Sequence, residues 1–93
     1  MDKDEARGIL RDHLEHFRAR TREELLPLID EPEVAEVTAP SGARYQVEVM
    51  AVWDDRPDVN LRVMGAIDDG GLSAWLPLSE DFIMAPDGSF VGE

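Results

Sequence analysis

An alternation of apolar and polar side chains between residues 43 and 78 constrains this chain more than any other feature. In three successive runs an apolar residue occupies every second position, which is the spacing that places side chains on one face of a β-strand. Segments rich in aspartate and glycine separate the runs, as is typical of turns. This pattern predicts a three-stranded antiparallel meander with one apolar face. The runs are Tyr45 to Trp53, Val59 to Ile67 and Leu72 to Leu78.

The two connections predict how the strands pair. A five-residue loop between the first two runs would place Trp53 opposite Val59. A two-residue type I′ turn at Asp69-Gly70 would place Ile67 opposite Leu72. Both registers keep the apolar rows on the same face, and a slip of one residue would turn one row toward solvent.

Further strands are predicted on both sides of the meander. Residues 33–39 are rich in valine, and Pro40-Ser41-Gly42 is typical of a three-residue hairpin loop. Acidic residues suit this first segment to the edge of a sheet. After the meander, residues 82–85 are a short strand candidate. Gly65, inside the third strand, is expected to mark a bulge or the close approach of another element.

Residues 3–26 are predicted to form one long amphipathic helix that ends before Pro27. A rival interpretation breaks the helix at Ala19–Arg20, because Thr21 to Glu24 has the spacing of a capping box. We prefer the single helix, because a second helix would hold Pro27 in its interior. The apolar stripe comprises Ala6, Ile9, Leu10, His13, Leu14, Phe17, Thr21, Leu25 and Leu28.

Together these patterns predict one α+β domain over residues 1–93. A long N-terminal amphipathic helix would pack on one face of a four- or five-stranded antiparallel meander sheet. Ninety-three residues are enough for one core. The strands are expected at about 33–39, 43–53, 59–68, 72–78 and 82–85, with 89–92 as a further candidate.

The acidity of the chain limits its partners. A formal net charge of −12 argues against nucleic acid and anionic membranes and favours basic partners. Residues 1–29 carry six basic and seven acidic side chains, whereas residues 30–93 carry three basic and fourteen acidic ones. The excess of negative charge therefore belongs to the sheet half.

Composition also bears on location. The chain has no cysteine, which excludes disulfides and thiolate metal sites. No apolar run approaches the ~20 residues that span a bilayer, and residues 1–20 are charged rather than signal-like. We expect a soluble, cytoplasmic protein that needs no cofactor.

The basic side chains of the helix lie off its apolar stripe. The simplest interpretation is a solvated face, in which Arg11 pairs with Glu15 and Arg20 with Glu24. The alternative is that these arginines contact the acidic sheet of a second copy and produce a homodimer. The basic residues of this face are Arg7, Arg11, Arg18, Arg20 and Arg22.

Two groups of residues are weak candidates for a metal site. His13 and His16 are three residues apart on the helix and could converge on one ion, but no spacing identifies a third ligand. The aspartates at the turns lack the spacing of a calcium loop, and turn chemistry accounts for them. No nucleophile or acid–base motif is present. The turn aspartates are Asp54, Asp55, Asp58, Asp68 and Asp69.

The second face of the predicted sheet is more apolar than a solvated face should be. The predicted registers place Met64 opposite Trp75 and Met50 opposite Arg62. One explanation is that the C-terminal segment, from Phe82 to Val91, covers this face. The other is a partner-binding surface, because interfaces favour Trp, Met and Arg. Its candidate residues are Met50, Val52, Arg62, Met64 and Trp75.

The sequence therefore favours a small acidic protein-binding domain without catalytic activity. The charge fits an inhibitor, immunity-type or regulatory protein that acts on a basic partner, because complementary fields steer association. The alternative is a metal-dependent enzyme or metal sensor that uses His13, His16 and nearby carboxylates.

Overall fold

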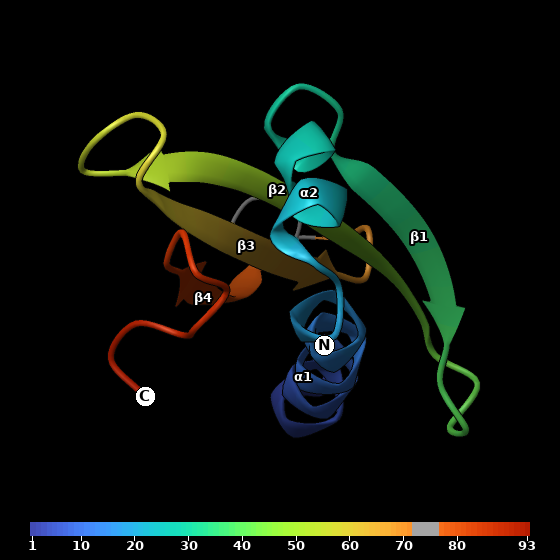
Figure 1. The fold of residues 1–93 in the computed structure, drawn as a ribbon. Helices are drawn as coiled ribbons and strands as arrows, with labels where there is room; N and C mark the ends of the chain where they lie inside the picture. Colours follow the sequence, from blue (N-terminus) through green and yellow to red (C-terminus); the bar gives the residue numbers. More distant parts are fainter. Residues whose placement is uncertain (72–76) are drawn as a thin grey trace.

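The computed structural model describes residues 1–71 and 77–93. Its strands pair in the order β1-β2-β3-β4 as an antiparallel meander, and the long helix α1 crosses one face of this sheet (Figure 1). The predicted α+β fold is confirmed. The elements are α1 (Lys3–Arg18), α2 (Arg22–Leu25), the 3-10 helix η1 (Leu26–Ile29), β1 (Glu33–Thr38), β2 (Arg44–Asp54), β3 (Asn60–Asp68) and β4 (Leu78–Met84).

The first helix forms as its sequence predicts. The side chain of Asp2 accepts a hydrogen bond from the Glu5 backbone N–H, and Asp4 and Glu5 lie in the first turn, where the helix dipole favours negative charge. One face of the helix is buried against the sheet. Its buried residues are Ala6, Leu10, Leu14 and Phe17.

The prediction of a single helix over 3–26 is wrong, and the rival break is correct. Helix α1 ends at Arg18, and Thr21 starts α2 with a complete capping box, in which Thr21 and Glu24 each bind the other's backbone N–H. Pro27 is accommodated because it lies in the first turn of η1, where its missing N–H has no partner to lose. The backbone thus turns at Ala19–Arg20.

The hairpin between β1 and β2 confirms the predicted three-residue loop. The backbone N–H of Ala39 donates to the carbonyl of Ala43 at 2.8 Å, and Gly42 has the positive φ of 90° that this loop requires. The segment 85–89 repeats this arrangement: the N–H of Ala85 donates to the Ser89 carbonyl, and Gly88 has a φ of 88°.

The register between β2 and β3 differs from the predicted one by two residues. Trp53 pairs with Leu61 instead of Val59, and Val47 pairs with Ile67. Strand β2 extends to Asp54, and the loop begins at Asp55, whose φ of 65° is a left-handed conformation that aspartate tolerates. Because the shift is an even number, the same side chains still face the helix.

The predicted pairing of the last strand is wrong. Ile67 pairs with Leu78 rather than Leu72, so the Asp69-Gly70 turn closes no two-residue hairpin. Residues 79–81, which separate the strands predicted at 72–78 and 82–85, lie within β4, and the latter prediction corresponds to its second half. The polar residues 79–81 interrupt the apolar alternation that indicates a strand. Glu80 can nevertheless occupy the helix-facing side of β4, because Arg11 neutralises it there. Of the strand predicted at 72–78, residues 72–76 lie outside the described residues.

The C-terminal segment extends the sheet beside β4. Met84 and Phe90 form an isolated bridge, and the N–H of Val91 donates to the Ile83 carbonyl at 2.8 Å. The ring of Phe90 meets that of Phe82 edge-on, with centroids 5.7 Å apart. The candidate strand at 89–92 is therefore reduced to a single bridge.

The core lies between the sheet and the helical segments. Helix α1 packs mainly against β3 and β4, whereas η1 packs against β2. This arrangement leaves the β1 side of the sheet beyond the cover of α1 (Figure 1). Among the described residues, no helix has the length and apolarity that a membrane crossing requires.

Candidate functional site

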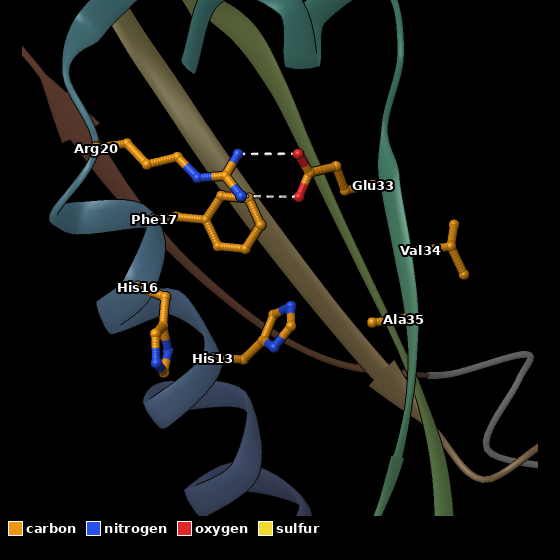
Figure 2. Close-up of a pocket in the computed structure, with 7 residues that line it drawn as sticks. All are labelled: His13, His16, Phe17, Arg20, Glu33, Val34 and Ala35. Atoms are coloured by element: carbon orange, nitrogen blue, oxygen red, sulfur yellow. Dashed lines mark hydrogen bonds and ion pairs between the residues drawn. The ribbon is translucent and has the colours of Figure 1, made fainter. Parts of the chain in front are cut away.

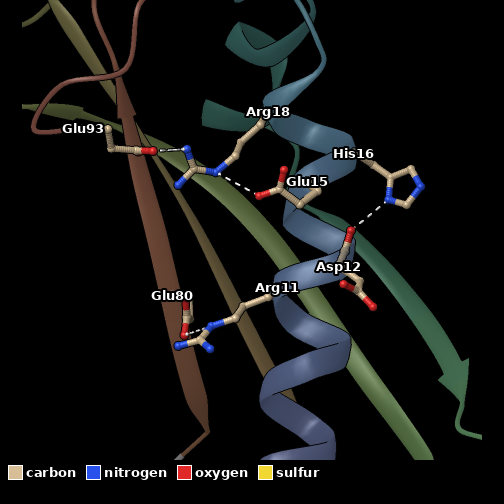
Figure 3. Close-up of polar contacts among 7 residues, drawn as sticks. All are labelled: Arg11, Asp12, Glu15, His16, Arg18, Glu80 and Glu93. Atoms are coloured by element: carbon tan, nitrogen blue, oxygen red, sulfur yellow. Dashed lines mark hydrogen bonds and ion pairs between the residues drawn. The ribbon is translucent and has the colours of Figure 1, made fainter.

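Three arginines in and just after α1 bind carboxylates of the sheet half rather than the helix partners predicted for two of them. The Nε of Arg11 lies 2.9 Å from Oε1 of Glu80 in β4, and Nη1 of Arg18 lies 2.7 Å from Oε1 of Glu93 (Figure 3). Arg20 pairs with Glu33 of β1 through two hydrogen bonds of 2.9 and 3.0 Å. The predicted partners, Glu15 for Arg11 and Glu24 for Arg20, are therefore wrong, although the Arg11 side chain remains 63% exposed.

Arg18 also stacks on aromatic rings. Its guanidinium carbon lies 4.9 Å from the centroid of the Phe82 ring and 5.0 Å from that of Phe90. Its Nε lies 3.5 Å from the Glu15 carboxylate (Figure 3). Arg18 thus joins the end of α1 to the C-terminal segment.

Many carboxylates of the sheet half are in no ion pair within the described residues. They lie before and along β1, on the outer face of the sheet and in the loops. In the described part of the same half, the cations in no ion pair are Arg44 and Arg56, so these carboxylates outnumber them. The carboxylates are those of Asp30, Glu31, Glu36, Glu48, Asp55, Asp58, Asp68 and Asp87.

A groove of about 530 Å³ runs between α1 and β1. It exists because α1 packs on β3 and β4 and leaves the side chains of β1 without a helix above them. Figure 2 shows Ala35 of β1 pointing toward His13 and Phe17 of the helix, whereas Val34 points away. The lining residues are His13, His16, Phe17, Arg20, Glu33, Val34 and Ala35.

An ion pair spans the groove at one end. Arg20, from the link between α1 and α2, binds the carboxylate of Glu33 on β1 (Figure 2). The guanidinium of Arg20 also lies 4.1 Å from the centroid of the Phe17 ring. The hydrogen bond with Arg20 lowers the pKa of Glu33 from its ordinary value. Glu33 therefore stays ionised and holds β1 at a fixed distance from α1.

His13 and His16 occupy different surroundings. His13 is half-buried, with its ring 5.4 Å from that of Phe17, and burial, together with the charge of His16, lowers its pKa. The Nδ1 of His16 lies 3.0 Å from the Asp12 carbonyl oxygen (Figure 3). Among residues 1–71 and 77–93, no three histidine or carboxylate side chains gather as a metal site would require.

Four of the aspartates at the turns adopt turn conformations or accept hydrogen bonds from nearby backbone N–H groups. Asp55 and Asp58 both adopt a φ of 65° in the loop between β2 and β3. The side chain of Asp68 accepts from the Gly70 N–H at 2.8 Å, and that of Asp69 accepts from the Gly71 N–H at 3.1 Å. The turn chemistry predicted for these four is confirmed, whereas Asp54 lies in β2 and pairs with Arg62.

The outer face of the sheet carries four of the five predicted partner-binding residues. Met50 lies directly opposite Met64, and Val52 lies opposite Arg62. The prediction that Met64 faces Trp75 is wrong, because its β4 neighbour is Asp81. Trp75 itself lies outside the described residues.

Two features of this face differ from expectation. Arg62 is held by ion pairs to Asp54 and Asp81, so it offers no free cation. The C-terminal segment does not cover the face, because Phe82 and Phe90 pack on the helix side of the sheet. Partner binding by Met50, Val52, Arg62 and Met64 stays a prediction.

No protein family, curated protein or solved structure matches this chain. The case for a function therefore rests on the surface itself.

The groove is the feature that the sequence interpretation missed. Phe17 was assigned to the apolar stripe of the helix, but the period of that stripe does not show that α1 is displaced toward β4. One signal was available. Glu33 and Ala35, a charged and a small residue, alternate on the side of β1 that faces the helix, which indicates that this side is incompletely covered.

Proposed function

We propose that this protein is a small, non-catalytic binding domain for a basic protein, in the manner of an inhibitor, an immunity-type protein or a regulatory protein. One observation carries the proposal: Arg11, Arg18 and Arg20 are neutralised within the chain, whereas carboxylates around β1 and the loops are in no ion pair among the described residues. A surface of this kind attracts a cationic partner and accelerates its association.

The same ion pairs argue for a different protein as the partner rather than a second copy. A self-complementary dimer would need helix arginines free to bind the sheet of the other chain. Three of the five arginines that this alternative requires, Arg11, Arg18 and Arg20, instead bind Glu80, Glu93 and Glu33 of their own chain. Two copies, each with a formal net charge of −12, would also repel one another.

The test is affinity capture from the source cell at low salt, followed by reconstitution with the purified partner. We expect a basic partner whose dissociation constant rises steeply between roughly 50 and 500 mM salt, as screening weakens the attraction. A set of acidic or neutral partners whose affinities do not change with salt would contradict the proposal.

Matched charge variants locate the effect. Glu36→Gln removes one negative charge from β1, and Asp12→Asn removes one from α1; neither carboxylate is in an ion pair within the described residues. We expect Glu36→Gln to weaken binding roughly two- to fivefold, in the range of an exposed charge pair. Asp12→Asn serves as the control for net charge and should have a smaller effect.

A further inference from the structure

We propose that the open edge of β1 and the groove beside it accept an extended segment of the partner, which adds a fifth strand to the sheet. The segment carries apolar side chains at alternate positions and Lys or Arg at its ends. This inference rests on the proposed function, because it names the place and the form in which the basic partner binds.

The backbone of β1 supplies the first part of the site. Strand β1 is the first in the sheet order, and within residues 1–71 and 77–93 it pairs only with β2. In an antiparallel pair, every second residue directs its backbone N–H and C=O away from the neighbouring strand. The backbone N–H of Ala39 donates to the Ala43 carbonyl and so points toward β2, which means that the even-numbered residues of β1 point these groups away from β2. In β1 these residues are Val34, Glu36 and Thr38. Their polar groups can therefore pair with an added strand.

The groove supplies the second part. Alternate side chains of an added strand point to the helix side of the sheet, where the groove of about 530 Å³ lies. Phe17, His13 and Ala35 form its walls, and the small side chain of Ala35 leaves room between α1 and β1 (Figure 2). Apolar side chains of the segment would be buried there against His13 and Ala35, which are only partly buried within the chain.

Charge selects the occupant. Strand β1 contains two glutamates and no basic residue, and Asp30 and Glu31 precede it. Glu33 is neutralised by Arg20, but Glu36 and Glu31 are in no ion pair among the described residues. A segment with Lys or Arg at its ends would place cations beside these carboxylates. The same acidic side chains oppose edge-to-edge pairing between two copies, a known device at exposed sheet edges.

The probes are three blocked peptides of the form Lys-X-Thr-X-Thr-X-Lys, in which X is valine, leucine or phenylalanine. We expect at least one peptide to bind, and to slow amide hydrogen exchange at Val34 and Glu36 more than at Ala35, because only the first two N–H groups face the open edge. Methylation of one alternate set of backbone nitrogens in the peptide should abolish binding, whereas methylation of the other set should leave binding intact. The reason is that only one of the two sets of peptide N–H groups faces β1.

The variant Val34→Pro removes an outward N–H without breaking the pairing with β2. Val34 is 53% exposed, and proline is tolerated at such edge positions. Its matched control, Val34→Ala, keeps the N–H. We expect Val34→Pro to bind the peptide roughly tenfold more weakly than the control, which corresponds to the loss of a hydrogen bond at the edge.

A second variant tests the groove without changing the edge. Ala35→Leu fills the space between α1 and β1 and leaves every backbone N–H in place, so it should weaken peptide binding while the protein remains folded by circular dichroism. The proline variant and the leucine variant thus test the two halves of the site separately.

The outcomes separate this inference from the proposed function. If a basic partner or peptide binds but the amides of Val34 and Glu36 remain unprotected, or the changes map to Met50 and Met64, the strand-addition inference is overturned and the function stands. Self-association through β1 would also overturn it. If neither the peptides nor any basic protein binds, both proposals fail.

Discussion

Leu10 of α1 lies directly above Gly65 of β3. A Cβ atom added to Gly65 would be 2.9 Å from Cδ1 of Leu10 and 3.0 Å from Cδ2 of Leu14, closer than nonbonded carbon atoms approach. The helix therefore rests on the backbone of the strand. The interpretation of Gly65 as a point of close approach is confirmed.

The first prediction follows from this contact. Gly65→Ala should lower the free energy of unfolding by about 1–3 kcal/mol, because Leu10 and Leu14 are buried and must shift to admit the methyl group. Adding Leu10→Ala should then cost less than it does in the wild-type chain, because the two changes share one space. Urea denaturation of the single and double variants measures this coupling.

Gly8→Ala is the matched control. Gly8 lies in α1, is exposed, and has no atom within 4 Å of an added Cβ. The substitution should therefore stabilise the protein by up to about 1 kcal/mol through helix propensity. Equal effects of the two glycine substitutions would show that propensity, not contact with α1, governs Gly65.

The second prediction concerns the tyrosine. The hydroxyl of Tyr45 donates to Oε1 of Glu5 at 2.8 Å, which raises the pKa of Tyr45 to about 12. Because the chain has one tyrosine, the absorbance of tyrosinate follows this group alone. We expect a midpoint near 12 in the folded protein, and a lower one in Glu5→Gln. Asp4→Asn, in the same helical turn, should leave the midpoint nearly unchanged.

The raised pKa of Tyr45 also determines how the free energy of unfolding changes at high pH. The pKa is raised above the unfolded value of about 10, so the contribution of Tyr45 is present below pH 10 and is lost as the pH rises from about 10 toward 12. Tyr45→Phe should remove this part of the alkaline decline. A midpoint of about 10 in the folded chain would contradict the bond to Glu5.

The third prediction concerns His13, whose pKa is lowered by burial and by the charge of His16. A histidine with a lowered folded pKa contributes fully above the unfolded value of about 6.5 and destabilises the fold as the pH falls through that value. The free energy of unfolding should therefore decrease on acidification below about pH 6.5, and His13→Gln should flatten this dependence.

Proton NMR resolves the contribution of the neighbour. We expect the His13 ring to titrate below 6.5, and His16→Gln to move its midpoint upward by removing a nearby positive charge. A His13 midpoint at or above 6.5 would contradict the half-buried position of the ring against Phe17.

The fourth prediction tests the helix break. The Oγ1 of Thr21 accepts from the Glu24 N–H at 3.2 Å, and Glu24 accepts in return from the Thr21 N–H at 3.0 Å. Thr21→Ala should lower the free energy of unfolding by about 1 kcal/mol, whereas Thr21→Ser keeps the acceptor and should lower it less. If serine were as destabilising as alanine, the cap would contribute nothing.

Local signals predicted the parts of this fold that local chemistry decides. The loop at Pro40-Ser41-Gly42 follows from a proline and a glycine at set positions, and its hydrogen bond from Ala39 to Ala43 forms as expected. The apolar rows of β2 and β3 likewise assign each side chain to the correct face. In both cases neighbours in the sequence carry the information.

The misplaced elements depend on distant partners. Glu80 was left outside the predicted strands, and its compensating cation, Arg11, lies on α1, far away in the sequence. The groove could not be predicted for a similar reason. Its width depends on the position of α1 over the sheet and on the ion pair between Arg20 and Glu33, which no periodicity reveals.

The two-residue difference between the predicted and observed β2–β3 registers has a consequence for how the strands find their alignment. Both alignments bury the same rows, so hydrophobic burial alone does not distinguish them. Moving β3 by two residues would replace Gly65 beneath α1 with Val63 or Ile67, whose side chains would collide with Leu10. In this protein a missing side chain, rather than a contact, selects one alignment from two that are otherwise equivalent.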